Sequence, residues 1–289
     1  MGLRADRQAL ESSSHFGLSP RLGLRYRLSA ADDLRLSWGR SIQAQDADEL
    51  LIEGGARFFY RPQTTDQLTL GYEHRLPGGI ELRVDLYDKK IHDPRPRFEN
   101  LLNTLTLAPE LKPDRLRIEP LSANARGVEW SIRQSEPGRP TWWVSYSFAK
   151  AVDRFADHQA PRSWDQRHTV SAGLSVESPK WTFGASLLAR SGWPSTRVRT
   201  DLTGPIPLVI AARRNTSNLG NYVSLDLRIA RRFELQQGSL STFLELTNAL
   251  DRRNPCCTAY DLDEEKPGLD LETKTFLPRF PSLGFVWKF

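Results

Sequence analysis

The chain has 289 residues, of which 39% are hydrophobic and 10% aromatic, with eight Trp and a single Met. Its mean hydropathy is −0.50, and no run approaches the ~18–20 apolar residues that a membrane-spanning helix needs. The net charge of +5 comes from basic residues scattered among acidic ones, which argues against a nucleic-acid-binding surface. A helical membrane protein is thereby excluded, whereas a membrane β-barrel is not, because its alternating strands average out as hydrophilic.

Twelve segments alternate apolar and polar residues with the period of two that is typical of a β-strand. The clearest is 79–91, in which four apolar residues at even positions from Ile80 to Leu86 alternate with three charged residues and Tyr87. In chain order the predicted strands are 2–8, 20–28, 33–44, 66–75, 79–91, 124–134, 141–151, 167–176, 180–190, 222–232, 239–249 and 281–289.

One face of these segments is free of charge, and the other carries charged side chains. A cation on a lipid-facing position costs about 2–4 kcal/mol at the bilayer midplane, so an uncharged face is typical of contact with lipid. The sequence therefore predicts an all-β fold, a transmembrane antiparallel β-barrel with a polar lumen. The charged residues expected to face that lumen are Glu81, Arg83, Asp85, Glu129, Arg133, Asp226 and Arg228.

The connections alternate in length. Short turns rich in Gly, Pro and Asp are expected near 29–33, 76–79, 136–139, 177–179 and 236–238. Long segments are expected at 9–19, 45–65, 92–123, 152–166, 191–221 and 250–280. A barrel with tight periplasmic turns and long extracellular loops has this alternation, whereas a soluble sandwich has no reason for it.

Several short motifs, in order along nearly the whole chain, resemble one family. They are Ser19–Tyr26, Leu36–Gln43, Leu70–Leu76, Leu82–Tyr87, Ala125–Trp130, Trp164–His168, Leu246–Arg252 and the terminal Phe289. The chain resembles the C-terminal half of the barrel of TonB-dependent outer-membrane receptors. The resemblance implies a 22-stranded barrel around a plug in a Gram-negative outer membrane. It also implies import of a scarce ligand such as a ferric siderophore, vitamin B12 or a glycan, and no enzymatic activity.

Compared with that family, the sequence lacks a plug, a TonB-contacting box and roughly ten strands. Residues 1–8 have no apolar segment of a secretory signal. We therefore expect residues 1–289 to be the C-terminal portion of a receptor barrel, either a fragment or a truncated gene product, which contacts TonB only through the missing plug. Twelve strands alone are expected to form an open or poorly closed half-barrel.

The alternative is a self-contained twelve-stranded barrel, such as a porin, an autotransporter translocator or an outer-membrane hydrolase. A porin is compatible with the charged lumen. A translocator needs a passenger and a pore helix, which residues 1–18 do not supply. A hydrolase needs a Ser–His pair on one face, but His168 and Ser171 are three residues apart and face opposite sides of a strand.

Five arginines gather around the 191–221 loop: Arg190, Arg197, Arg199, Arg213 and Arg214. A loop folded over the mouth would present them to an anionic ligand such as a ferric siderophore, or to lipopolysaccharide phosphates. The alternative is that they complement the charge of the outer leaflet and bind no ligand.

Other motifs in the outer loops favour structural roles. The segment 164–168 is expected to form a rim network through Asp165 and Arg167, and Asn248 to cap strand-end backbone groups. Cys256 and Cys257 could form a vicinal disulfide, bond other segments or remain free thiols. The five histidines have no metal-ligand spacing, so neither a metal nor a cofactor is predicted.

The last strand ends in alternate aromatic residues, Phe285, Trp287 and Phe289. The family resemblance implies that such a strand is the signal read by the outer-membrane insertion machinery, through β-augmentation. Aromatic rings are also favoured at membrane interfaces, so the alternative is that Phe289 is one more girdle residue.

Overall fold

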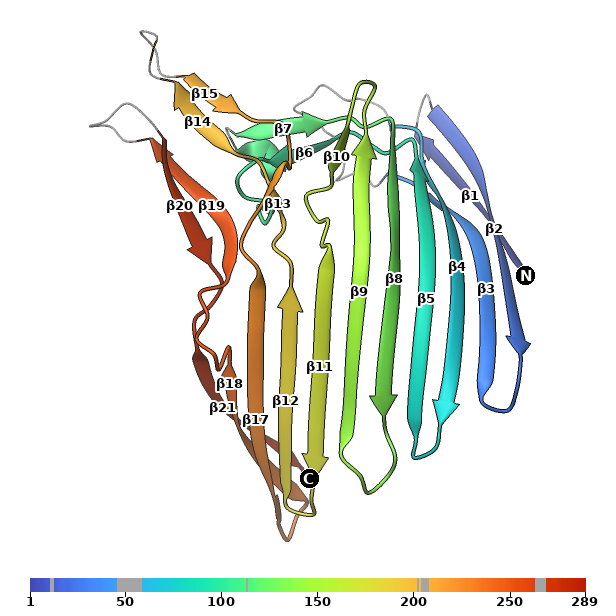
Figure 1. Ribbon diagram of the computed structural model, residues 1–289, viewed down its shortest axis with the longest axis vertical. Helices are drawn as coiled ribbons and strands as arrows, with labels where there is room; N and C mark the ends of the chain where they lie inside the picture. The colour runs from blue at the N-terminus through green and yellow to red at the C-terminus, as the bar shows by residue number, and fades with distance from the viewer. Residues whose placement is uncertain (11–12, 46–58, 113, 202, 204–207, 263–268) are drawn as a thin grey trace.

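The computed structural model describes all residues except 11–12, 46–58, 113, 202, 204–207 and 263–268. Twelve long strands form one curved antiparallel sheet (Figure 1), which confirms the all-β prediction. In sheet order they are β1 (Gly2–Leu10), β2 (Ser13–Arg27), β3 (Asp32–Gln43), β4 (Gln63–Leu76), β5 (Ile80–His92), β8 (Ser122–Gln134), β9 (Thr141–Arg154), β11 (His168–Glu177), β12 (Trp181–Arg190), β17 (Tyr222–Glu234), β18 (Ser239–Thr247) and β21 (Phe280–Lys288).

The register of the sheet keeps apolar side chains on one face. One row runs across five strands through Leu36, Leu70, Leu86, Val128 and Phe148, each paired with the next. No second layer covers this row, and Leu70 and Leu86 are 46% and 49% exposed. Lipid is therefore the medium that this face is suited to meet.

Tight turns join the strands at one end of the sheet. In the β4–β5 turn, Gly78 and Gly79 have φ angles of 79° and 70°, a left-handed conformation that other residues rarely adopt. By contrast, most connections at the other end are long and form small hairpins above the sheet (Figure 1). These comprise β6 (Arg97–Asn100) with β7 (Arg115–Ile118), β13 (Pro194–Ser195) with β16 (Ser217–Asn218), β14 (Val198–Asp201) with β15 (Leu208–Ala211), and β19 (Pro255–Leu262) with β20 (Leu269–Thr275). The short β10 (Gln159–Pro161) pairs with β9, and η3 (Pro109–Leu111) is a 3₁₀ turn.

The prediction of a long loop at 9–19 is wrong. β1 continues to Leu10 and β2 starts at Ser13, which pair directly. The reason is that the alternation with a period of two already begins before residue 20. Phe16 and Leu18 lie on the same face as the apolar residues of the predicted strand that follows. The alternation of short and long connections therefore begins only after β2. Much of the predicted 45–65 loop lies outside the described residues.

The two ends of the sheet are β1 and β21, and within the described residues they do not pair with each other. The predicted open half-barrel is therefore the form that the structure has. Among the same residues, the structure contains no helix with the length and apolarity that a membrane crossing requires.

Candidate functional site at the lumen face and outer mouth

The seven residues predicted to face the lumen lie on the face opposite the apolar rows. Glu81 pairs across the sheet with Arg133, and the two side chains form an ion pair of 3.0 Å. Arg83 forms an ion pair with Asp85. Asp85 lies opposite Glu129. Farther along the same face, on β17 and β18, Arg228 contacts Glu245 at 3.1 Å, and Ser224 donates a hydrogen bond of 2.8 Å to Asp226.

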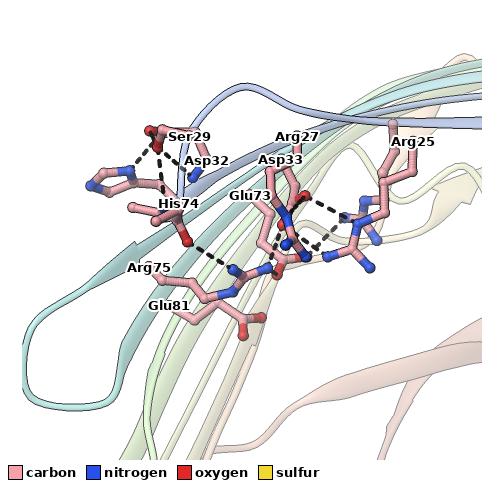
Figure 2. A network of polar contacts seen from close by, with 12 residues as sticks. Arg25, Arg27, Ser29, Asp32, Asp33, Glu73, His74, Arg75 and Glu81 are labelled. Atoms are coloured by element: carbon pink, nitrogen blue, oxygen red, sulfur yellow. Dashed lines mark hydrogen bonds and ion pairs between the residues drawn. The ribbon is translucent and has the colours of Figure 1, made fainter.

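A denser network of charged side chains lies at the turn end of this face (Figure 2). Asp33 is 1% exposed, and Arg25 donates two hydrogen bonds to it, Nε–Oδ1 at 3.2 Å and Nη2–Oδ2 at 2.8 Å. Arg75 also bonds Asp33, and Arg27 lies 3.8 Å away. This cluster was not predicted from the sequence. In the alternation of its own strand each of these residues falls on the charged face, and that shared position is the signal that could have indicated the cluster.

A second ion network lies beneath the outer loops and holds Arg214. The Arg214 side chain is 7% exposed and contacts Glu99 at 2.7 Å and Asp153 at 3.2 Å. Ser163 donates to Glu99 at 2.6 Å, and Arg97 contacts Asp153 at 2.7 Å. Arg214 was expected on an exposed basic surface, but it is buried because these carboxylates from β6 and β9 surround it.

This network predicts an acid-sensitive loop cluster. Burial opposes ionisation of Glu99, but Arg97 and Arg214 outweigh it and hold the pKa of this carboxyl below its ordinary value. A lowered pKa contributes stability above the unfolded-state pKa of about 4.3, and this contribution is lost as pH falls through the folded-state pKa. We expect protease cleavage of the loops to increase as pH falls from 7 to about 3.

Glu99→Gln should make the loops more protease-sensitive at pH 7 and reduce their pH dependence. The matched control is Glu119→Gln, since Glu119 is 54% exposed and its ion pair is with the exposed Arg117. An unchanged pH profile in Glu99→Gln would show that another group controls the acid response.

An aromatic cage surrounds Arg190 at the outer mouth. The guanidinium lies 4.5 Å from the ring centres of both Trp193 and Tyr222 and 5.7 Å from that of Phe276. Arg190 pairs with Tyr222 across the sheet, and both alternate with lipid-facing residues, so both lie on the lumen side. Trp164 extends the cage: its ring packs edge-on against that of Trp193, with 5.0 Å between the ring centres, and its side chain is 55% exposed.

The remaining predicted arginines are exposed: Arg199 lies in β14, Arg197 directly precedes it, and Arg213 follows β15. None of them forms an ion pair within 4 Å in the part of the chain that the structure describes. The five arginines are therefore not a single cluster: one is caged, one is buried and three are open to solvent. Sequence reasoning missed the cage because Trp193, Tyr222 and Phe276 come from three separate segments.

The rim motif at 164–168 forms the structural network that was predicted. Asp165 accepts a hydrogen bond of 2.7 Å from the Ala151 backbone and one of 2.8 Å from Arg167. Gln166 donates to the Ser191 carbonyl at 3.0 Å. These contacts tie the long loop to β9 and to the end of β12, which confirms the prediction.

Asn248 likewise has the predicted capping role. It is 3% exposed with φ 49°, and its side-chain amide donates to the carbonyls of Arg252 at 3.0 Å and Leu277 at 3.2 Å. Asp226 accepts from the Asn248 backbone N–H at 2.8 Å. The cap thereby joins the end of β18 to the segment that enters β21.

Cys256 and Cys257 are buried free thiols whose sulfur atoms lie 2.8 Å apart. The register of β19 against β20 shifts between Pro255 and Cys257, and such a bulge can turn two adjacent side chains to one side. Burial and the neighbouring Cys256 raise the pKa of the Cys257 thiol to about 12.

We expect both thiols to alkylate slowly at pH 8 in the folded protein and rapidly in denaturant. The vicinal disulfide, one of the three alternatives for this pair, is tested in the same experiment. If it forms in cells, denatured protein will react only after a reductant is added.

The predicted insertion strand lies at the open edge of the sheet. Phe285 and Trp287 pair with Thr242 and Leu240 of β18 on the lipid-facing side. Phe289 follows β21, is 98% exposed and contacts Trp287 edge-on at 5.8 Å. Among the described residues, no group of three or more His, Cys, Asp or Glu could hold a metal.

A family model described as "TonB dependent receptor-like, beta-barrel" matches residues 1–249. The chain belongs to this family. Its family and fold place the TonB-dependent receptor barrel in a Gram-negative outer membrane, with the long loops outside. No curated protein matches the chain in sequence.

Solved structures show the same fold at low sequence identity. A ferric-catecholate import receptor, Fiu from K12 E. coli, is 14% identical with a TM-score of 0.57, covering 94% of this chain and 35% of that one. The FrpB iron transporter from Neisseria meningitidis is 14% identical with a TM-score of 0.63, covering 99% and 42%. The copper transporter OprC is 13% identical with a TM-score of 0.65, covering 96% and 40%. The chain thus spans well under half the length of these structures.

Proposed function

We propose that this chain is the C-terminal portion of a TonB-dependent receptor that imports a scarce anionic metal chelate such as a ferric siderophore. In this proposal residues 1–289 complete a 22-stranded barrel with further strands. Contact with TonB is made through a plug region rather than through the wall described above. The receptor acts in transport and carries out no chemistry on its ligand.

The observation that carries this proposal is the Arg190 cage. A guanidinium held between Trp193 and Tyr222 offers a cation and flat rings on the lumen side of the mouth. Aromatic rings stack on planar chelators, and a guanidinium bonds anionic oxygens. Arg197, Arg199 and Arg213, exposed around the same mouth, would attract such an anion from outside.

The test is uptake of ⁵⁵Fe-labelled siderophores by cells that express the protein at its natural length. We expect accumulation that depends on TonB and on the proton-motive force. Arg190→Ala should weaken ligand binding about tenfold or more, because it removes a charge-assisted hydrogen bond to an anionic oxygen of the ligand, worth about 1.5–3 kcal/mol. Arg139→Ala is the matched control, because Arg139 lies in an exposed turn at the opposite end. Steady conductance in planar bilayers, with no TonB-dependent uptake of any chelate, would instead indicate a porin.

A separate prediction concerns the terminal strand. Deletion of Phe289 should lower outer-membrane levels and leave aggregates in the periplasm, because we propose that the insertion machinery pairs with this aromatic edge. The measurement is the ratio of outer-membrane to periplasmic protein on immunoblots. The matched control is Phe280→Ala, at the other end of the same strand. Undiminished insertion after the deletion would refute the signal role and leave the barrel assignment standing.

A further inference from the structure

The lipid-facing side of β5, β8 and β9 changes from apolar to basic toward the outer loops. The apolar rows end at Leu86, Val128 and Phe148, which pair across the three strands. Continuing each strand outward by steps of two, the same face carries Lys90, Arg126, Lys150 and Arg154, which we call the outward basic patch. The registers of β5–β8 and β8–β9 run without a shift, so these side chains remain on the lipid-facing side.

Two cations of the outward basic patch, Lys90 and Arg126, have a carboxylate as cross-strand neighbour, but each of these carboxylates is bound by another side chain. Arg126 lies opposite Asp88 on one side and directly opposite Lys150 on the other, and like charges in the latter arrangement destabilise a sheet unless an anion compensates them. Among the described residues, none of the four forms an ion pair or a side-chain hydrogen bond. The one carboxylate within the patch is Asp88, which accepts a hydrogen bond of 2.9 Å from Asn124 instead.

A neighbouring cation on the same face shows the contrast. Arg40 of β3 is bound by Asp66 through two hydrogen bonds of 2.7 Å and 2.8 Å, and His92 lies 3.2 Å from the same carboxylate. Asp66 thus binds Arg40 and not Lys90, which lies opposite it on β5, so the patch on β5, β8 and β9 keeps a net positive charge at the same level of the wall.

The surface here is also hollowed. A depression of about 1180 Å³ is lined by all four cations of the patch and, below them, by apolar residues that include Leu70, Leu86 and Phe148. One end of the depression is thus basic and the other apolar. This combination suits an amphiphile whose phosphate lies outward and whose acyl chain lies along the barrel wall.

We propose that the outward basic patch binds the phosphate of a phosphorylated glycolipid in the outer leaflet. The patch lies directly above the lipid-facing rows, at the level where the headgroups of that leaflet meet the barrel. A soluble anion would bind the basic end, but it has no acyl chain to contact the apolar end. This site faces away from the lumen, so the proposal is independent of the imported ligand.

The test uses the natural-length protein purified in detergent and incorporated into phosphatidylcholine nanodiscs. Binding of bisphosphorylated lipid A is compared with that of its dephosphorylated form and of inorganic phosphate. We expect lipid A to bind, with an affinity that falls as salt is raised, and the other two probes to bind at least tenfold more weakly. Equal binding of the dephosphorylated lipid overturns the proposal, and so does inorganic phosphate binding as tightly as lipid A.

Variants locate the site. Lys90→Gln/Arg126→Gln should weaken lipid A binding about thirtyfold, because each basic residue near a charged membrane surface contributes about fivefold. The matched control is Lys89→Gln/Arg133→Gln, which removes two cations from the lumen side of the same two strands. An equal loss in both pairs, or no loss in the first, overturns the assignment. Circular dichroism establishes that both pairs retain the β-sheet.

Discussion

Replacing Arg214 by alanine should destabilise the outer loop cluster by about 3–5 kcal/mol. The substitution leaves Asp153, with 0% of its side chain exposed, and Glu99, with 15%, short of one cation in a largely buried site. Removing one partner of a buried pair is costly because the remaining charge stays buried. Arg97 still pairs with both carboxylates and Arg162 with Asp153, which places the cost at the lower end of this range. Since the network joins β6, β9 and the 191–221 loop, the loops should open together.

Urea unfolding in detergent, followed by hydrogen exchange of the loop amides, measures this change. Arg213→Ala is the control, because the neighbouring Arg213 is exposed and should change stability by less than about 0.5 kcal/mol. Equal effects of the two substitutions would mean that the buried network does not hold the loops. Asp153→Asn combined with Arg214→Ala should recover part of the loss, since it removes one of the uncompensated charges.

The strands could be predicted because each carries its own signal. The apolar positions of β5 and β8 alternate with charged ones, and alternation fixes which face meets lipid wherever that face is uncharged. The lumen positions of Glu81 and Arg133 follow from the same alternation, and their pairing follows from the register.

The outer end was less predictable because its contacts are not local. Glu99 and Arg214 are 115 residues apart in the chain, and no pattern around either residue indicates the other. The Arg190 cage likewise needs Phe276, which comes from the last long connection. The five arginines were grouped by sequence proximity, whereas burial and aromatic contacts separate them into three different environments.

The error at residues 9–19 has a different cause. The prediction ended the first strand at residue 8, ahead of the polar residues at 11–14, although the chain beyond them continues to alternate. Strands that extend past the lipid no longer need an apolar face, so hydropathy alone places their outer ends too early.

Val144→Arg should cost about 2–4 kcal/mol of unfolding free energy, and Ser145→Arg much less. The two positions are adjacent, so they lie at the same depth in β9 and differ only in the face they occupy. Val144 pairs with Ile132 and Ala172 in the lipid-facing rows, whereas Ser145 pairs with Ser131 and Ser171, and its hydroxyl lies 2.7 Å from that of Ser171. An arginine at Val144 must therefore enter lipid, whereas one at Ser145 enters the aqueous lumen.

The chain already contains a cation on the lipid-facing side, and its position shows why depth matters. Arg231 lies close to the turn end of β17, with its guanidinium 5.1 Å from the ring centre of Trp181 and 4.8 Å from that of Phe233. At the interface a long side chain reaches water while its stem packs on aromatic rings, and the cost falls to about 0–1 kcal/mol. Val144 is too far from either end of the strand for an arginine at this position to reach water in this way. Urea titration of both variants in phosphatidylcholine vesicles measures the difference, and equal stabilities would show that the Val144 face does not meet lipid.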